Sequence, residues 1–167
     1  RMGAPGRAIL GQDPLEYRRD RKTPWVSALL GPCFGSSTWY ACLSDFVVMK
    51  KGAILAVASN KVTSIAIKQE VDSEELGGWK LHSTVTGLVD RVVEDDKEAL
   101  DEIKKFLSYF PSHNNELPPI HNVQENKNNI DNILNILPES KHQVYDSKKI
   151  TDLIFDDESA FELKRKF

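Results

Sequence analysis

The most constraining feature of this sequence is an apolar run that leads through a glycine- and serine-rich turn into a second apolar segment. Residues 26–30 are short, apolar and partly β-branched, which is typical of a strand buried on both faces. Gly31 and Pro32 end the run, because proline removes a backbone donor and glycine permits a sharp turn. Residues 35–38 then favour a helix start. The stretch 24–45 is therefore predicted to form a strand, a turn and a helix.

The backbone N–H groups at such a helix start have no acceptors within the helix, so they point outward. Groups of this kind bind anions, or oxygens that become negative during a reaction. The simpler alternative is a tight connection between a strand and a helix inside a core. Spacing alone favours that simpler interpretation.

The composition fits one globular domain, or one domain and part of another. With 167 residues, 40% of them hydrophobic, the chain can bury roughly 70% of its unfolded surface. A formal net charge of -3 argues against nucleic acid as the main partner, and no apolar run is long enough to span a membrane. Cys33 and Cys42 have neither zinc nor disulfide spacing, and they are predicted to be buried, reduced thiols.

Further elements follow along the chain. Apolar runs predict strands at residues 46–49, 53–58 and 88–93, whereas residues 61–68 fit either a strand or a helix. His82 has no partner at metal-ligand spacing, so a structural, hydrogen-bonded role is predicted for it.

Two helices have well-marked ends. Asp72 can cap a short helix over residues 72–78, and Gly77 is expected to supply its left-handed stop. Asp95 can cap a longer helix over residues 95–110. The apolar residues of the longer helix recur at helical spacing: Leu100, Ile103, Leu107 and Phe110.

The segment after this helix differs in composition. Residues 112–144 are rich in asparagine, glutamine and proline, which predicts a linker that crosses a surface. A second helical pattern follows at residues 145–155.

Several blocks occur here in the order and spacing of one protein family. They are LGPCFGSSTWYACLSDFVVMKKGAILAVA, then EELGG-x-x-x-H, TG-x-x-D and LSY-x-P, and finally YDSKKI with FEL. Together they resemble the carboxyltransferase (β) subunit of biotin-dependent acyl-CoA carboxylases, the propionyl-CoA carboxylase type, in the crotonase-like superfamily.

The resemblance implies an α/β fold of the ClpP/crotonase type, a ββα spiral. It puts residues 1–113 in the C-terminal half of the N-terminal carboxyltransferase domain, residues 114–143 in a linker, and residues 144–167 at the start of the C-terminal carboxyltransferase domain. Because the chain begins with Arg1 rather than methionine, we expect an internal piece of a longer polypeptide. The resemblance puts a second oxyanion site in the missing second domain, so we expect this piece to be inactive by itself.

The resemblance also implies a reaction, the transfer of a carboxyl group from carboxybiotin to the α-carbon of an acyl-CoA of the acetyl- or propionyl-CoA class. The expected cofactor is biotin on a carrier protein or domain, with acyl-CoA as substrate and no metal in this segment. The expected partners are the biotin carboxyl carrier and biotin carboxylase components, and further copies of the subunit in a homo-oligomer. Neither nucleic acid nor a membrane span is expected, and the expected location is the cytoplasm or the mitochondrial matrix.

On the crotonase pattern, Gly35, Ser36 and Ser37 take the position of the glycines that form an oxyanion hole. The backbone amides of Ser36 and Ser37 are therefore the expected catalytic donors. The serine hydroxyls are not expected to act as nucleophiles, because the pattern has no histidine or aspartate partner for them. Trp39 stands where hydratases of this superfamily have a glutamate, which argues against a hydratase. Substrate contacts are expected at Gly35, Thr38, Trp39 and Tyr40.

Other interpretations stay open. The chain could belong to the α subunit of a biotin-dependent acyl-CoA decarboxylase, which pumps sodium, or be a non-catalytic fragment or assembly piece that keeps only the fold. Lys50 and Lys51 could meet the phosphates of coenzyme A, or they could simply be solvated turn residues.

Overall fold

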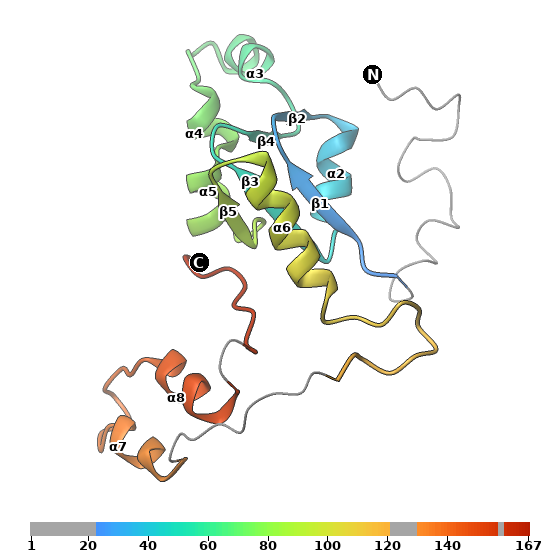
Figure 1. Ribbon diagram of the computed structural model, residues 1–167. Helices are drawn as coiled ribbons and strands as arrows, with labels where there is room; N and C mark the ends of the chain where they lie inside the picture. Colours follow the sequence, from blue (N-terminus) through green and yellow to red (C-terminus); the bar gives the residue numbers. More distant parts are fainter. Residues whose placement is uncertain (1–22, 121–129, 157–158) are drawn as a thin grey trace. The chain divides into compact units, whose positions relative to one another are not determined.

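The structure is a computed structural model that describes residues 23–120, 130–156 and 159–167 (Figure 1). It contains two compact units. Among the described residues, the first comprises 23–119 together with 163–167, and the second comprises 120, 130–156 and 159–162. The last residues of the chain therefore return to the first unit.

Two parallel sheets form the centre of the first unit. The larger one has the strand order β1-β3-β5, formed by β1 (Val26–Leu29), β3 (Phe46–Lys50) and β5 (Arg91–Val93). The smaller one pairs β2 (Pro32–Phe34) with β4 (Ile54–Ala56). Parallel pairing throughout, with helices between the strands, confirms the predicted α/β class.

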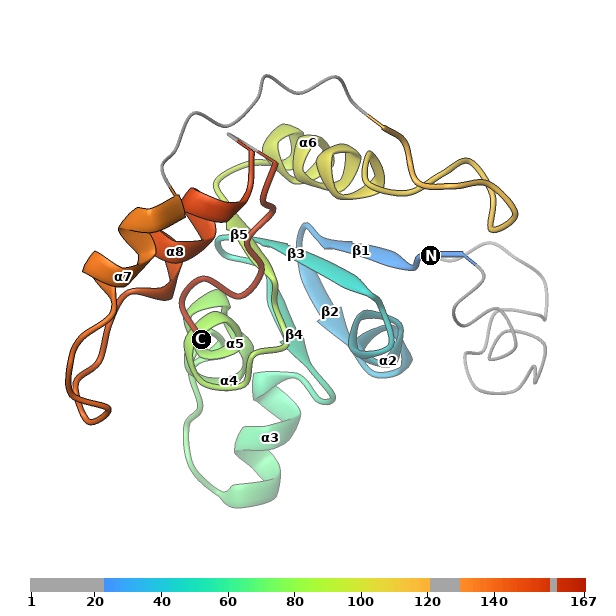
Figure 2. The same cartoon turned by 90° about the horizontal axis from the view of Figure 1, so that it is seen from below.

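Among the described residues, five helices accompany these strands: α2 (Ser36–Cys42), α3 (Asn60–Ile67), α4 (Ser73–Gly77), α5 (Trp79–Thr84) and α6 (Asp96–Leu107). Figure 2 shows α6 on one side of the three-stranded sheet, with β2, β4 and α2 on the other side. Within the described ranges, no helix is long and apolar enough to cross a bilayer.

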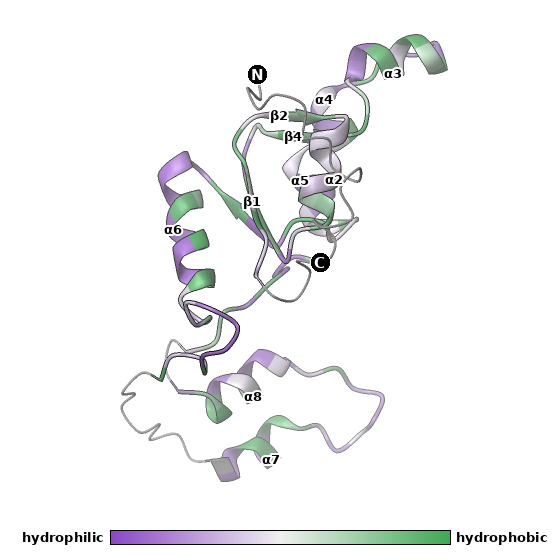
Figure 3. Ribbon diagram, turned by 90° about the vertical axis from the view of Figure 1, so that its right-hand side faces the viewer, coloured by the Kyte–Doolittle hydropathy of each residue, from purple (hydrophilic) through white to green (hydrophobic). Residues whose placement is uncertain are grey.

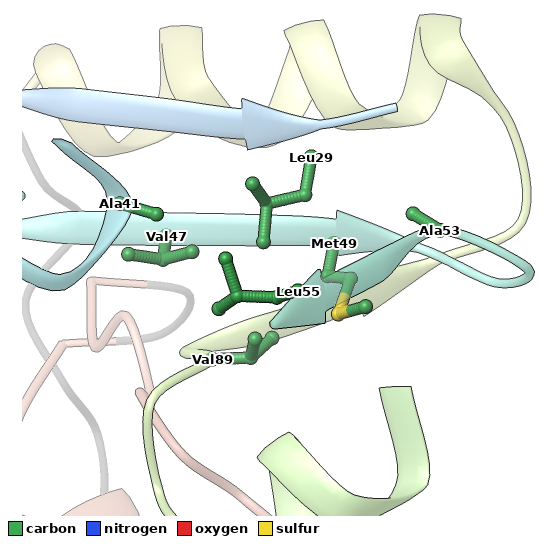
Figure 4. Packing of buried hydrophobic residues seen from close by; sticks show 7 residues of the cluster. All are labelled: Leu29, Ala41, Val47, Met49, Ala53, Leu55 and Val89. Atoms are coloured by element: carbon green, nitrogen blue, oxygen red, sulfur yellow. The ribbon is translucent and has the colours of Figure 1, made fainter. Parts of the chain in front are cut away.

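Strand β3 is the most buried element of the fold, and its side chains alternate between the two layers. Phe46 is fully buried and stacks on Phe106 of α6, with ring centroids 4.6 Å apart. Val47 and Met49 belong instead to the cluster on the opposite face, which Figure 4 shows. The other members of that cluster are Leu29, Ala41, Ala53, Leu55 and Val89. A strand buried on both faces thus holds the two layers together.

The buried face of α6 differs from the predicted stripe. Leu100, Leu107 and Phe110 are 50%, 38% and 41% exposed, and only Ile103 of the predicted four is half-buried. The residues that α6 buries are Ala99 and Phe106. Both sets have helical spacing, and the stacking of Phe106 on Phe46 decides which face meets the sheet. Figure 3 shows hydrophobic and hydrophilic residues alternating along the α6 ribbon.

The predicted strands are correct in place but not in every bound. Strand β1 is half-buried apart from Leu29, because it is an edge strand among those described. Strands β4 and β5 are shorter than predicted, and the ambiguous residues 61–68 form α3. The prediction missed β2, since Pro32 there suggests a turn; proline is tolerated because it is the first residue of a strand.

Gly77 does not end α4 in a left-handed conformation, as the sequence suggested. Gly77 is the last helical residue, and Gly78 caps the helix with extended dihedral angles (φ -78°, ψ 171°). A Cβ on Gly77 would lie 2.3 Å from the carbonyl oxygen of Leu55, so close backbone approach explains the glycine. The predicted cap is confirmed, because Asp72 accepts hydrogen bonds from the amides of Glu74 and Glu75.

The two cysteines lie in different environments. Cys33 is half-buried in β2, and burial raises the pKa of its thiol. Cys42 is exposed, which corrects the prediction that both thiols are buried. It occupies the last position of the short helix α2, whose buried residues are Thr38 and Ala41.

The second unit is small and helical. It contains a 3-10 turn (Ile130–Asn132), α7 (Ile133–Ile136) and α8 (Ser147–Ile154). Asp146 caps α8 by accepting a hydrogen bond from the amide of Lys148. The helix predicted within residues 145–155 is confirmed.

The C-terminal segment Leu163–Phe167 packs against the residues that precede β5. The Lys164 amide donates to the Asp90 carbonyl oxygen (3.1 Å), and its ammonium group donates to the Gly87 carbonyl oxygen (2.6 Å). The Asp90 carboxylate is buried and accepts a hydrogen bond from the Val47 amide (2.8 Å). Burial raises the pKa of the Asp90 carboxyl, while the Val47 amide and the Lys164 ammonium act in the opposite direction.

Substituting Gly77 by alanine should lower the free energy of unfolding by roughly 1–3 kcal/mol, the usual cost of overpacking. The new methyl group would meet backbone atoms of Leu55, which cannot rotate away. Gly31→Ala is the matched control, since a Cβ there has nothing within 4 Å, and it should change stability little. Urea unfolding of both variants measures the difference; equal stabilities would contradict the proposed close approach.

The buried Asp90 carboxyl should contribute a distinctive pH dependence. Its raised pKa means that the folded state holds this proton at pH values where the unfolded state has lost it, so the free energy of unfolding falls as pH rises through that window. In Asp90→Asn this contribution is absent. The stability of the parent relative to the variant should therefore increase as pH falls from about 7 toward about 4, measured by urea unfolding at several pH values. A difference that stays constant, or that decreases, would contradict this assignment.

Candidate active site

The candidate site is the turn between β2 and α2. Gly35 occupies this turn with φ 65° and ψ -133°, a conformation that side chains disfavour and glycine adopts freely. Its amide donates to the carbonyl oxygen of Val57 (2.9 Å), just beyond β4. The chain can therefore reverse sharply and start α2 at Ser36.

The two amides that the sequence indicates as donors are available in this turn. In the part of the chain that the structure describes, the amides of Ser36 and Ser37 meet no acceptor. This follows from their position, since the first N–H groups of a helix have no partner inside it. Ser36 is exposed and Ser37 is half-buried, so a ligand could approach the turn from solvent.

The three residues after the turn lie in different surroundings. Thr38 is buried, and its hydroxyl donates to the Ala56 carbonyl oxygen (2.8 Å). Trp39 is 51% exposed, whereas Tyr40 is half-buried. The structure therefore leaves Trp39 beside the turn as an accessible aromatic surface and puts Thr38 beneath it.

Strand β4 supports the turn through its carbonyl groups. Ala56 and Val57 accept the bonds from Thr38 and Gly35, and the preceding carbonyl, of Leu55, faces Nε2 of His82 at 2.8 Å. Sequence reasoning could not find this arrangement, because backbone acceptors carry no residue signature. This arrangement joins residues that are 18 (Thr38 and Ala56) and 27 (Leu55 and His82) positions apart in the sequence.

His82 has the structural role that the sequence predicts. It is 6% exposed, and its Nδ1 lies 2.9 Å from the hydroxyl of Thr86. Because the Leu55 carbonyl can only accept, Nε2 carries the proton and Nδ1 accepts from Thr86 in the neutral ring. Both nitrogens are thus engaged within the protein, which leaves His82 no free nitrogen to act as a base.

The turn lysines are paired with acidic side chains. Lys50 forms an ion pair with Asp96 (2.6 Å), and Lys51 pairs with Glu94. The Lys51 ammonium also lies 5.3 Å from the ring centroid of Trp79. Neither lysine is simply solvated.

A hollow of about 420 Å³ is lined by residues other than those of the turn, among them Asp45, which precedes β3, and Phe110, which follows the end of α6. Among the described residues, no group of three or more histidine, cysteine, aspartate or glutamate side chains could hold a metal ion. What the turn offers chemically is a pair of fixed N–H donors.

Comparison with known proteins identifies the family. Residues 16–167 match the carboxyl transferase domain. The uncharacterized carboxylase YngE of Bacillus subtilis is 29% identical over the whole of this chain and 32% of its own length. The propionyl-CoA carboxylase beta chain of Roseobacter denitrificans is 28% identical over 86% of this chain and 29% of its own length. The methylmalonyl-CoA decarboxylase subunit alpha of Propionigenium modestum is 27% identical over 89% of this chain and 30% of its own length.

A solved structure, that of transcarboxylase 12S, shares this fold. A crystal structure of transcarboxylase 12S with hydrolysed methylmalonyl-coenzyme A bound superimposes with a TM-score of 0.79 and 28% identity, over 87% of this chain and 29% of that chain. The chain thus spans about three-tenths of the length of these relatives. The family match confirms the resemblance to carboxyltransferase subunits that the sequence showed, and the shared parallel architecture confirms the crotonase-like fold class. This chain belongs to the carboxyl transferase domain family.

Proposed function

We propose that this chain is part of the carboxyltransferase component of a biotin-dependent acyl-CoA carboxylase. The protein that carries it would move a carboxyl group from carboxybiotin to the α-carbon of an acyl-CoA of the acetyl- or propionyl-CoA class. The observation that carries the proposal is that the amides of Ser36 and Ser37, at the start of α2 in a chain of this family, meet no acceptor among the described residues.

The chemistry requires stabilised negative charge at two oxygens. Removing the α-proton of an acyl-CoA gives an enolate at the thioester, and loss of carbon dioxide from carboxybiotin would leave the negative charge on the ureido oxygen. Fixed backbone donors stabilise such charge without reorganising, and one donor is worth roughly 2.7–4 kcal/mol of barrier. The Ser36 amide is our assigned donor to the thioester oxygen, with Ser37 beside it, and the ureido anion of biotin would supply the acceptor for the α-proton.

Neighbouring residues would form the wall of the substrate site. Gly35 lets the backbone approach the ligand closely, while Trp39 and Tyr40 present aromatic surface next to the donors. Among the described residues, neither serine hydroxyl is hydrogen-bonded to a histidine, aspartate or glutamate side chain that could act as a general base, so we assign them no nucleophilic role.

The wider assignment follows the family. We propose biotin on a carrier protein or domain as cofactor, the carrier and biotin carboxylase components as partners, and a location in the cytoplasm or mitochondrial matrix. A solved relative, transcarboxylase 12S, is described as a hexamer in a multienzyme core, which supports a homo-oligomer here. We also propose the division into residues 1–113, 114–143 and 144–167 as half-domain, linker and start of the second carboxyltransferase domain.

A second candidate is the α subunit of a biotin-dependent acyl-CoA decarboxylase. The similarity to methylmalonyl-CoA decarboxylase subunit alpha, 27% identical over 89% of this chain, supports it about as well as the carboxylases support the first. A non-catalytic piece that keeps the fold is the third. Assays of carboxylation and of decarboxylation on the complete protein distinguish the three.

The backbone of Ser36 should matter more than its hydroxyl. Ser36→Ala keeps the amide and should keep most activity, whereas Ser36→Pro deletes the donor and should lower kcat about 10²–10³-fold. Ser36 is the first residue of α2, where proline is tolerated, so the variant should fold. Steady-state carboxyl transfer by the complete protein, with circular dichroism, is the measurement.

Ser73→Pro is the matched control for this experiment, since Ser73 is the first residue of another helix, α4. It should leave kcat unchanged. If Ser36→Ala is as inactive as Ser36→Pro, the hydroxyl is the working group and the proposed mechanism is wrong. If both Ser36 variants keep full activity, the turn is only a connection between strand and helix.

The 167-residue chain by itself should not catalyse transfer. We place the second oxyanion site of the reaction in the second carboxyltransferase domain, of which residues 144–167 would be only the start. Incubating the purified chain with biotin and malonyl-CoA or methylmalonyl-CoA tests this, because measurable turnover would show that one site suffices.

A further inference from the structure

We propose that Thr38 is a positioning residue, whose buried hydroxyl holds the Gly35–Ser37 turn in the geometry that its donors need. This inference rests on the proposed role of the turn. The sequence predicts Thr38 as a substrate contact, but its side chain is only 6% exposed and its hydroxyl donates to the Ala56 carbonyl oxygen at 2.8 Å. The hydroxyl also lies 3.5 Å from the Cys33 carbonyl oxygen, at the outer limit of a hydrogen bond.

Thr38 connects the turn to β4 through two different groups. Its amide donates to the Gly35 carbonyl oxygen (3.1 Å), so its backbone is part of the turn. Its side chain reaches the last residue of β4. A displacement of the turn relative to β4 must therefore stretch or break the hydroxyl bond.

A second bond anchors the other side of the turn. The Gly35 amide donates to the Val57 carbonyl oxygen (2.9 Å), and Val57 directly follows Ala56. Ser36 and Ser37 thus lie between two bonds that reach successive carbonyl groups of one strand end. No other side chain in the described part of the turn contributes a bond to β4, so Thr38 is the residue through which a substitution can test the anchor.

The strand that receives these bonds is itself held in place. Phe34 of β2 is the register partner of Ala56, and the Leu55 carbonyl faces buried His82 at 2.8 Å. Leu55 is 2% exposed and belongs to the core cluster. The anchor is therefore rigid, and misplacing a catalytic group by about 1 Å can cost about 10²-fold in rate.

Thr38→Val tests the proposal, because valine keeps the shape and removes only the hydroxyl. In the complete protein, kcat should fall about 10–100-fold with the KM for acyl-CoA nearly unchanged, and Thr38→Ser should restore most of kcat. Amide hydrogen exchange at Gly35 should be faster in Thr38→Val than in Thr38→Ser. Thr84→Val is the matched control, since Thr84 is exposed and its hydroxyl donates to the Lys80 carbonyl oxygen at 2.8 Å within α5, and it should leave kcat unchanged.

The outcomes separate this inference from the proposed function. If Ser36→Pro is inactive while Thr38→Val is fully active, the turn acts as proposed and the positioning role is wrong. If Ser36→Pro is fully active, the proposed function of the turn fails whatever Thr38→Val does. If Thr38→Val does not fold, Ser and Ala at this position are compared instead, because they differ only in the hydroxyl; equal kcat values would overturn the positioning role.

Discussion

The burial of β3 between two layers is the interaction on which the rest of the structure depends. Phe46 faces α6 and stacks on Phe106, while Val47 and Met49 face the cluster formed with Leu29 and Leu55. Each fully buried side chain of this kind contributes about 1.5–3 kcal/mol. Because the strand is fixed on both faces, its neighbours in the sheet and the chain segments that leave them have defined positions.

The candidate site takes its rigidity from that core. Leu55 is a member of the core cluster, and the residues after it in β4 present the carbonyl groups that hold Gly35 and Thr38. The turn itself consists of small polar residues that bury little apolar area, so it could not hold a geometry by packing alone. Backbone acceptors at the end of a buried strand supply what packing does not, and the Ser36 and Ser37 amides meet no acceptor among the described residues.

Much of the fold and the place of the candidate site could be predicted, for reasons that differ by element. Asp72 and Asp95 cap helices as predicted, because a capping side chain acts on amides two or three residues away. The Gly35–Ser37 turn was found because a glycine followed by helix-starting residues after an apolar run is a local pattern. The stripe of α6 was predicted wrongly, since Leu100 and Phe106 belong to alternative faces that fit the same periodicity and only the contact with Phe46 decides between them.

The sequence by itself determined the α/β class, the caps, the strands near residues 26–30 and 46–49, and the family, because these depend on local spacing or on recognisable blocks. Only the tertiary structure decided that Gly77 is required by the approach of Leu55, and that the hydroxyl of Thr38 lies under the turn. It also decided that Lys164 returns to Asp90. The physical reason is common to all three: each contact joins a residue to a backbone atom or a buried carboxylate far away in the sequence, and spacing along the chain carries no record of such a contact.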